Sequence, residues 1–185
     1  MDGKTDVEAH RIHVRKVLTL MREHKLFENL KKCIFAANEL PLLGCIVGKN
    51  GVRPDPEKIK AISDWPVPVD VKGLQKFLGL AAYLRKYSRN YAEMTVHPSR
   101  LLKKNTRWSW SAECQHSFRG DKKSLVQSPV LAIADQDRTF HVVCDASDFA
   151  IGCALIQYDS DKVERVVCHQ SRQLQAAERN YLVHD

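Results

Sequence analysis

The sequence predicts an α+β fold with a helical middle section and an antiparallel sheet near its end. Apolar residues recur at helical spacing between Asp70 and Leu84. Two apolar, β-branched runs, 139–145 and 151–158, are separated by small residues, a pattern typical of neighbouring antiparallel strands. With 185 residues, of which 44% are apolar and 28% charged, the chain has the composition of a folded protein.

The first part of the chain combines one helix with short strands. Thr5 and Glu8 have the spacing of a capping box, which predicts a helix start. Short apolar runs predict strands at 32–35 and 42–48. Asn50-Gly51 then predicts the turn that follows, because both residues tolerate positive φ.

Two capped helices are predicted in the middle of the chain. Asp55 and Pro56 suit the cap and the first position of one helix, which Trp65-Pro66 stops. Asp70 is expected to cap the next, in which Gly79 would permit close contact with another helix. The buried stripe of this second helix is expected to consist of Leu74, Phe77, Leu78, Ala81 and Leu84.

Further helices and three strands complete the predicted elements. One helix is expected at 97–104, and another starts at Ser111 and is interrupted by Gly120-Asp121. After an extended stretch at 128–132, antiparallel strands are expected near 139–145, 151–158 and 163–170, with another segment beginning at 176.

The positive charge is concentrated in one segment. Residues 72–107 contain nine Lys or Arg residues and the single acid Glu93, whereas the whole chain has a net charge of +7. Such a block favours a polyanionic partner, although a solvated surface explains it equally well on composition alone.

The cysteines and the apolar runs indicate an intracellular protein. Six cysteines are scattered without a C-x-x-C pair, which favours buried, reduced thiols over disulfides or zinc. No run is long enough for a membrane span, and the polar N-terminus does not resemble a signal peptide. We therefore expect a cytoplasmic or nuclear protein that is not secreted and has no membrane partner.

Asp145 ends a β-branched apolar run and is followed by Ala146-Ser147. A carboxylate in this position is costly unless it binds a cation or accepts hydrogen bonds. Nucleases that use two metal ions place an acid at such a strand end. The other interpretation is that Asp145 caps a turn through Ser147 or backbone amides.

The most recognisable phrase of the chain is Phe77-Leu78-Gly79-Leu80-Ala81-Ala82-Tyr83. The other phrases, in chain order, are Lys32-Cys33-Ile34-Phe35, Leu43-Gly44-Cys45-Ile46-Val47, Asn50-Gly51-Val52, Ile62-Ser63-Asp64-Trp65-Pro66-Val67-Pro68, Trp110-Ser111, Ser128-Pro129-Val130-Leu131, Asp145-Ala146-Ser147, Ser171-Arg172-Gln173-Leu174 and Glu178-Arg179-Asn180-Tyr181. With these phrases in family order over nearly its full length, the chain resembles the middle of the pol polyprotein of gypsy-type LTR retrotransposons.

The resemblance implies a division of the chain into four segments. Residues 1–52 resemble the C-terminal part of the reverse-transcriptase palm, and 53–105 the helical thumb that holds the template–primer duplex. Residues 106–135 resemble the connection. Residues 136–185 resemble the first antiparallel strands of an RNase H-like domain.

The resemblance also implies roles for particular residues. Asp145 matches the first catalytic carboxylate of RNase H enzymes, which bind Mg²⁺ in a complete site. Thumb cations would contact the backbone of an RNA·DNA hybrid or DNA duplex without reading its sequence. The expected contact residues are Lys72, Lys76, Arg85, Lys86, Arg89, Lys103, Lys104 and Arg107. Lys72, Lys76, Lys86 and Arg89 are expected to project outward.

Three functions are compatible with these residues. The polymerase Asp pair and the later RNase H carboxylates of the family are not found in this chain, so we expect it to bind duplexes without catalysing either reaction and without a cofactor of its own. Alternatively, it is part of an intact polyprotein whose remaining palm, fingers and RNase H supply both active sites. A third possibility is a domesticated protein-interaction module.

Overall fold

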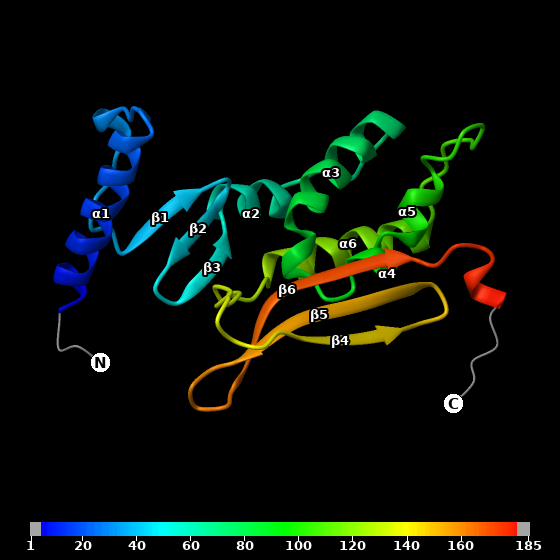
Figure 1. Ribbon diagram of the computed structural model, residues 1–185. Helices are drawn as coiled ribbons and strands as arrows, with labels where there is room; N and C mark the ends of the chain where they lie inside the picture. The colour runs from blue at the N-terminus through cyan, green and yellow to red at the C-terminus, as the bar shows by residue number, and fades with distance from the viewer. Residues whose placement is uncertain (1–4, 181–185) are drawn as a thin grey trace. The chain divides into compact units, whose positions relative to one another are not determined.

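The computed structural model describes residues 5–180 and divides the chain into two compact units, Met1–Leu40 and Pro41–Asp185. The first unit contains helix α1 (Asp6–Glu23) and the 3-10 turn η1 (Leu30–Lys32) (Figure 1). The predicted capping box at the start of α1 is confirmed. Thr5 Oγ1 accepts from Glu8 N at 3.3 Å, and Glu8 Oε2 accepts from Thr5 N at 3.0 Å.

The predicted strand at 32–35 is wrong. Asn29 Oδ1 accepts from Lys31 N at 3.0 Å and starts η1, which includes Lys32, and residues 33–35 belong to no strand. Asparagine side chains favour such local bonds over a strand ladder. The apolar residues Ile34 and Phe35 are exposed rather than buried in a sheet.

Three short strands follow, β1 (Glu39–Leu42), β2 (Cys45–Gly48) and β3 (Gly51–Pro54), in the order β1-β2-β3. The predicted strand at 42–48 is therefore split by a turn at Leu43-Gly44, where both residues have positive φ. The turn between β2 and β3 lies one residue earlier than predicted. Gly48 pairs with Gly51, so Lys49-Asn50 form the loop and Gly51 begins β3.

The helices of the middle section start at the predicted caps. Asp55 Oδ1 accepts from Glu57 N at 2.9 Å before α2 (Pro56–Ser63). Asp70 Oδ1 accepts from Gly73 N at 2.6 Å before α3 (Val71–Leu84), which continues into the 3-10 turn η2 (Arg85–Tyr87). The contact predicted at Gly79 is wrong, because this residue lies on the exposed face of α3.

Three further helices differ in detail from the prediction. They are α4 (Tyr91–Met94), α5 (Val96–Arg100) and α6 (Ala112–Val126). The helix expected at 97–104 starts and ends earlier, as α5. The break expected at Gly120-Asp121 is absent from α6, which is continuous because Phe118 and Leu125 on either side are fixed in the core. Tertiary packing of this kind overrides a weak local propensity.

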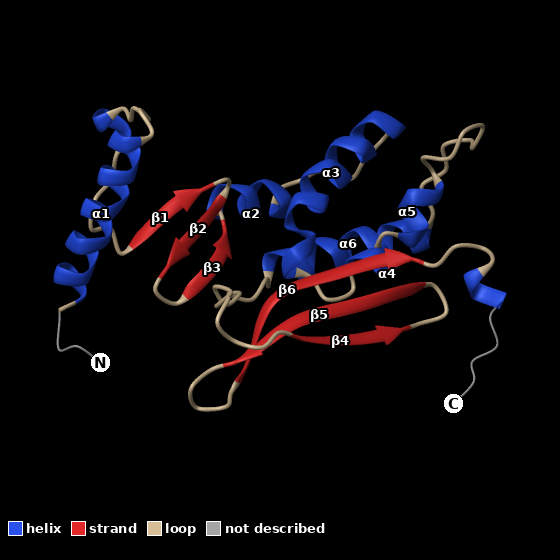
Figure 2. Cartoon of the chain, viewed as in Figure 1, coloured by secondary structure: helices blue, strands red, loops and turns tan. Residues whose placement is uncertain are grey.

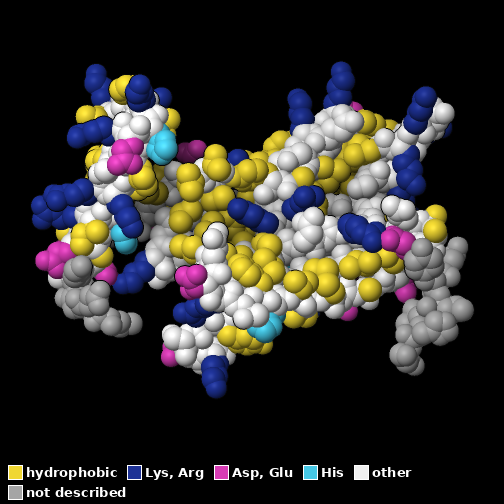
Figure 3. All heavy atoms as spheres, in the orientation of Figure 1, with side chains coloured by type: hydrophobic (Ala, Val, Ile, Leu, Met, Phe, Trp, Pro, Cys, Tyr) yellow, Lys and Arg dark blue, Asp and Glu magenta, His cyan; other side chains and the backbone are white. Residues whose placement is uncertain are grey.

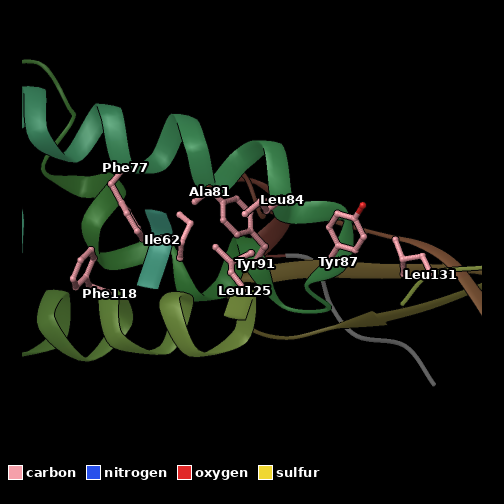
Figure 4. Close-up of a cluster of buried hydrophobic side chains, with 9 residues drawn as sticks. All are labelled: Ile62, Phe77, Ala81, Leu84, Tyr87, Tyr91, Phe118, Leu125 and Leu131. Carbon is pink, nitrogen blue, oxygen red and sulfur yellow. The ribbon is translucent and has the colours of Figure 1, made fainter. Parts of the chain in front are cut away.

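The main core lies between α2, α3 and α6, where the aromatic rings of Phe77 and Phe118 pack with centroids 4.7 Å apart. Leu74, Phe77, Ala81 and Leu84 of the predicted stripe are buried, and Leu78 is partly buried. Figure 4 shows the cluster, with α3 and α6 on opposite sides of it. Its members are Ile62, Phe77, Ala81, Leu84, Tyr87, Tyr91, Phe118, Leu125 and Leu131.

The predicted terminal sheet is present and antiparallel, in the order β4-β5-β6. Its strands are β4 (His141–Ala146), β5 (Ala150–Tyr158) and β6 (Glu164–Gln173), followed by the 3-10 turn η3 (Glu178–Asn180). Figure 2 shows these strands beside the helices of the second unit. Helix α4 is fixed to β6 by hydrogen bonds from Ala92 N to Ser171 Oγ (3.0 Å) and from Gln173 Nε2 to Ala92 O (3.3 Å).

The segment expected to begin at 176 contains η3, and its residues beyond 180 lie outside the described part. Within residues 5–180, no helix is both long enough and apolar enough to cross a membrane.

Candidate nucleic-acid interface

Two of the cations predicted to contact nucleic acid lie on the outer face of α3. Lys72 and Lys76 are exposed, whereas Leu74 and Phe77 are almost fully buried on the other side of the helix. This arrangement follows from the 3.6-residue period, which separates a polar face from an apolar one. The two ammonium groups are therefore held outside the core by a helix whose inner face is fixed.

A second set of cations, Lys103, Lys104 and Arg107, is exposed on the segment that follows α5. Leu101 anchors this segment, because it is buried in one cluster with Leu74 of α3. The two sets of cations therefore flank the same apolar contact. Figure 3 shows Lys and Arg side chains projecting above α3 and above the segment after α5. We call this surface the basic end; it consists of Lys72, Lys76, Lys103, Lys104 and Arg107.

Arg85 and Arg89 are exposed but lie at the other end of α3. At a rise of about 1.5 Å per residue, Arg85 lies about 20 Å from Lys72 along the helix axis. The structure therefore does not bring all of the predicted contact residues together.

Lys86 is half-buried, contrary to the prediction that it projects outward. Its Nζ atom donates to Cys45 Sγ at 3.3 Å and lies 5.1 Å from the centroid of the Tyr87 ring. The position of Lys86 at the end of the α3 stripe, where the helix tightens into η2, turns this side chain toward β2.

Asp145 lies on β4, directly opposite Gly152 of β5, and is exposed. It lines a pocket of about 80 Å³ together with Arg89 and Glu93. Ser147 and Ser171 contribute hydroxyl groups to the same pocket. Asp145 therefore has one cation and one further carboxylate in its surroundings. Ser147 forms the turn after β4, where its Oγ atom accepts from Ala150 N at 3.3 Å.

Comparisons with known proteins match both the sequence and the fold. Residues 110–185 match the family described as an RNase H-like domain found in reverse transcriptase. The chain is 34% identical over 187 residues to the retrovirus-related Pol polyprotein from transposon opus of Drosophila melanogaster, an alignment that covers 95% of this chain. It is 32% identical over 176 residues to the transposon Tf2-3 polyprotein of Schizosaccharomyces pombe, again over 95% of this chain.

The chain belongs with the Pol polyproteins of retrotransposons. It spans 18% of the length of the opus polyprotein and 13% of the Tf2-3 polyprotein. The predicted resemblance and the α+β class, with reverse-transcriptase and RNase H-like parts, are thereby confirmed.

Solved structures of the foamy viral protease-reverse transcriptase have the same fold. One of them superposes with a TM-score of 0.78 at 20% identity, covering 97% of this chain and 24% of the viral chain. A second, the dRH form, gives a TM-score of 0.78 at 20% identity over 97% of this chain and 32% of the viral chain. The chain therefore shares its fold with the matching part of the foamy viral protein.

The Mg²⁺ that RNase H chemistry requires does not fit the side chains around Asp145. In the described range, 5–180, no group of three or more His, Cys, Asp and Glu side chains could hold a metal ion. Divalent Mg²⁺ takes near-octahedral oxygen ligands, and a two-ion centre needs several carboxylates. Asp145 and Glu93 do not supply such a set.

Sequence reasoning missed two features of this Pol-type chain. The sequence shows Glu93 only as an isolated acid, because its proximity to Asp145 depends on the docking of α4 against the terminal sheet. The sequence predicts Cys45 only as a buried, reduced thiol, although it lies beside Lys86 and Tyr83, which are about forty residues away in sequence. No local pattern signals either contact.

Proposed function

We propose that the basic end holds the backbone of an RNA·DNA hybrid or DNA duplex without reading its sequence. The observation that carries this proposal is the convergence of five exposed cations on the buried contact between Leu74 and Leu101. Glu93, the only acid among residues 72–107, is in α4 near the terminal sheet and not in this group. Lysine and arginine side chains on a rigid support neutralise phosphates and release counterions.

Two observations favour contact with the phosphate backbone of the nucleic acid over recognition of its base sequence. The cations come from one helix face and one short segment, and exposed Lys and Arg side chains of this kind contact phosphates without reading base edges. The foamy viral proteins that share the fold were solved in complexes with an RNA/DNA hybrid and with double-stranded DNA. A hybrid helix is recognised mainly by its shape and backbone.

We further propose that the 185-residue polypeptide binds duplexes without cutting them. Asp145 and Glu93, the two carboxylates in the lining of this pocket in the described range, do not form a two-metal centre. Incubation of the pure polypeptide and Mg²⁺ with a labelled RNA·DNA hybrid should leave the RNA strand intact. Cleavage that is lost in Asp145→Asn would contradict this part of the proposal.

The test of binding is a fluorescence anisotropy titration with an RNA·DNA hybrid and a DNA duplex of unrelated sequences. Affinity should fall steeply with salt and depend little on sequence. The double variant Lys72→Gln/Lys76→Gln should weaken binding to all duplexes and reduce the slope of log K against log salt by about 1–2.

The matched control is Lys60→Gln/Lys123→Gln, which removes two exposed lysines of α2 and α6 outside the basic end. This variant should retain the parental salt slope. Equal slopes for the two double variants would place the contact elsewhere. No affinity for either duplex, together with salt-insensitive binding to a protein partner, would favour a protein-interaction module.

A further inference from the structure

Cys45, the first residue of β2, lies in a polar cluster that the duplex-binding function does not use. The residue is only 5% exposed, and its Sγ atom lies 3.3 Å from Lys86 Nζ, which donates to it. Tyr83 Oη lies 3.6 Å from the same sulfur. The buried Tyr87 hydroxyl also faces the thiol; it stands outside hydrogen-bonding geometry and has no other partner.

The backbone before Cys45 is shaped to admit this cluster. Gly44 has a φ of +73°, and a Cβ atom at this position would lie 2.7 Å from Tyr83 Oη and 2.7 Å from Lys58 Cε. Only glycine permits so close an approach in this conformation. Lys58 Nζ in turn lies 3.9 Å from the centroid of the Tyr83 ring. One ammonium group, that of Lys86, therefore lies against the sulfur, and a second, that of Lys58, lies against the ring of Tyr83.

These surroundings favour the ionised form of the thiol. Burial alone would raise the pKa of Cys45, but interactions with Tyr87, Tyr83 and Lys86, together with the charge of Lys86, bring its pKa below the usual 9.0. The pKa of Tyr83 is raised to about 12, first by burial and then by Cys45. Tyr83 therefore stays protonated near neutral pH and can donate a hydrogen bond to a thiolate.

We propose that Cys45 is a modification site, at which a thiolate held by Lys86 and Tyr83 reacts with small hydroperoxides. The sulfur attacks one peroxide oxygen, so that an S–O bond forms as the O–O bond breaks. The sulfur loses two electrons and becomes a sulfenic acid, while the hydroperoxide is reduced. With hydrogen peroxide, the hydroxide that leaves takes a proton from the Lys86 ammonium and becomes water.

The burial of Cys45 restricts this chemistry to small reagents. The thiolate is the reactive form of cysteine, and nearby lysines increase its population. Lys86 has two roles in this step, since its ammonium holds the thiolate at 3.3 Å and gives its proton to the leaving hydroxide as a general acid. Cys153 provides an internal contrast, because a hydrogen bond with Cys144, burial and the Cys144 charge raise its pKa.

The test is site-resolved labelling of the reduced 185-residue chain by mass spectrometry. Iodoacetamide reacts with thiolates, so its rate at each cysteine is followed from pH 6 to pH 10. Cys45 should reach half-maximal rate at a lower pH than Cys153. Lys86→Met should move the Cys45 profile to higher pH and slow its alkylation several-fold at pH 7.

Two controls separate this effect from unfolding. Lys123→Met removes an exposed lysine from α6, outside the basic end, and should leave the Cys45 profile unchanged. Tyr83→Phe should shift the Cys45 profile in the same direction as Lys86→Met, without removing a charge. Thermal unfolding, monitored by circular dichroism, checks that each variant is folded under the labelling conditions.

The hydroperoxide step is tested by treating the chain with hydrogen peroxide and trapping sulfenic acid with dimedone. Cys45 should be trapped before the exposed Cys144, and Lys86→Met should reverse this order. The proposal is overturned if Cys144 is trapped first in the parent chain. It is also overturned if the pH profile of Cys45 does not respond to Lys86→Met.

Discussion

Val52 and Leu131 form an isolated antiparallel bridge although 79 positions separate them in sequence. Val52 N donates to Leu131 O at 2.7 Å, and Leu131 N donates to Val52 O at 2.9 Å. The next residue, Ala132, donates from its N atom to Val166 O of β6 at 2.7 Å. The short segment around Leu131 therefore links the β2–β3 hairpin to the terminal sheet within the second unit.

The approach of Leu131 to the hairpin depends on Gly51. This residue has a φ of +127°, and a Cβ atom here would overlap with Leu131 O. Gly51→Ala should therefore destabilise the protein by about 1–3 kcal/mol, measured by urea unfolding. The control is Gly79→Ala in α3, where a Cβ atom meets nothing within 4 Å. Because alanine favours a helix interior, this variant should gain about 0.5–1 kcal/mol. Equal effects of the two substitutions would contradict the role of the bridge.

Asp121 is expected to make the protein less stable as the pH rises from about 4 to 8. Its carboxylate is fully buried in α6, neither oxygen has a hydrogen-bond partner, and burial raises its pKa to about 8. In the unfolded chain an aspartate has a pKa of about 3.9, so over this range the unfolded state ionises while the folded state stays protonated. The free energy of unfolding then falls by about 1.4 kcal/mol for each unit by which the pH rises.

This dependence predicts that Asp121→Asn raises the melting temperature at pH 7, because the amide cannot ionise. The gain should shrink toward pH 5, where the penalty on the carboxylate is smaller. Asp161→Asn, in the exposed turn between β5 and β6, serves as the control and should show no such trend. A gain from Asp121→Asn that stays constant between pH 5 and pH 7 would rule out ionisation as its cause.

The helices and the terminal sheet could be predicted because their signals are local. Thr5, Asp55 and Asp70 each cap the helix that their position indicated, and the stripe through Leu74 and Phe77 is buried. Each of these features depends on residues fewer than five positions apart. The same holds for the alternating runs that become β4 and β5, since adjacent antiparallel strands pair across a short turn.

The errors arose where distant contacts decide the structure. Asp121 sits in a continuous helix because Phe118 and Leu125 are fixed by α2 and α3, which no local pattern of α6 reveals. Lys86 has the sequence of an exposed thumb cation, but its orientation depends on Cys45 across forty-one positions. Among the predicted contact residues, only those anchored by the Leu74–Leu101 cluster form one surface.

Lys86 should contribute less to duplex binding than Lys76, although both lie in the cationic segment. Lys76 is exposed on α3, whereas the Lys86 ammonium is directed to Cys45 Sγ at 3.3 Å. An ammonium that bound a phosphate would first have to leave this contact. We therefore expect Lys76→Gln to lower the salt slope by about 1 and Lys86→Gln to lower it less, in anisotropy titrations under the same conditions. A larger loss for Lys86→Gln would show that the side chain turns outward when the duplex binds.

Strand β4 should promote self-association through its outer edge. In the described sheet, β4 is an edge strand, and all six of its residues are exposed, with Val142 exposed by 64%. Exposed apolar edge strands pair with other chains, and a lysine on such a strand opposes this pairing. Val142→Lys should therefore reduce light scattering at high protein concentration. Val163→Lys adds the same charge at a 47% exposed valine in the turn before β6, so it controls for net charge. If both variants suppress scattering equally, overall charge rather than the β4 edge governs the association.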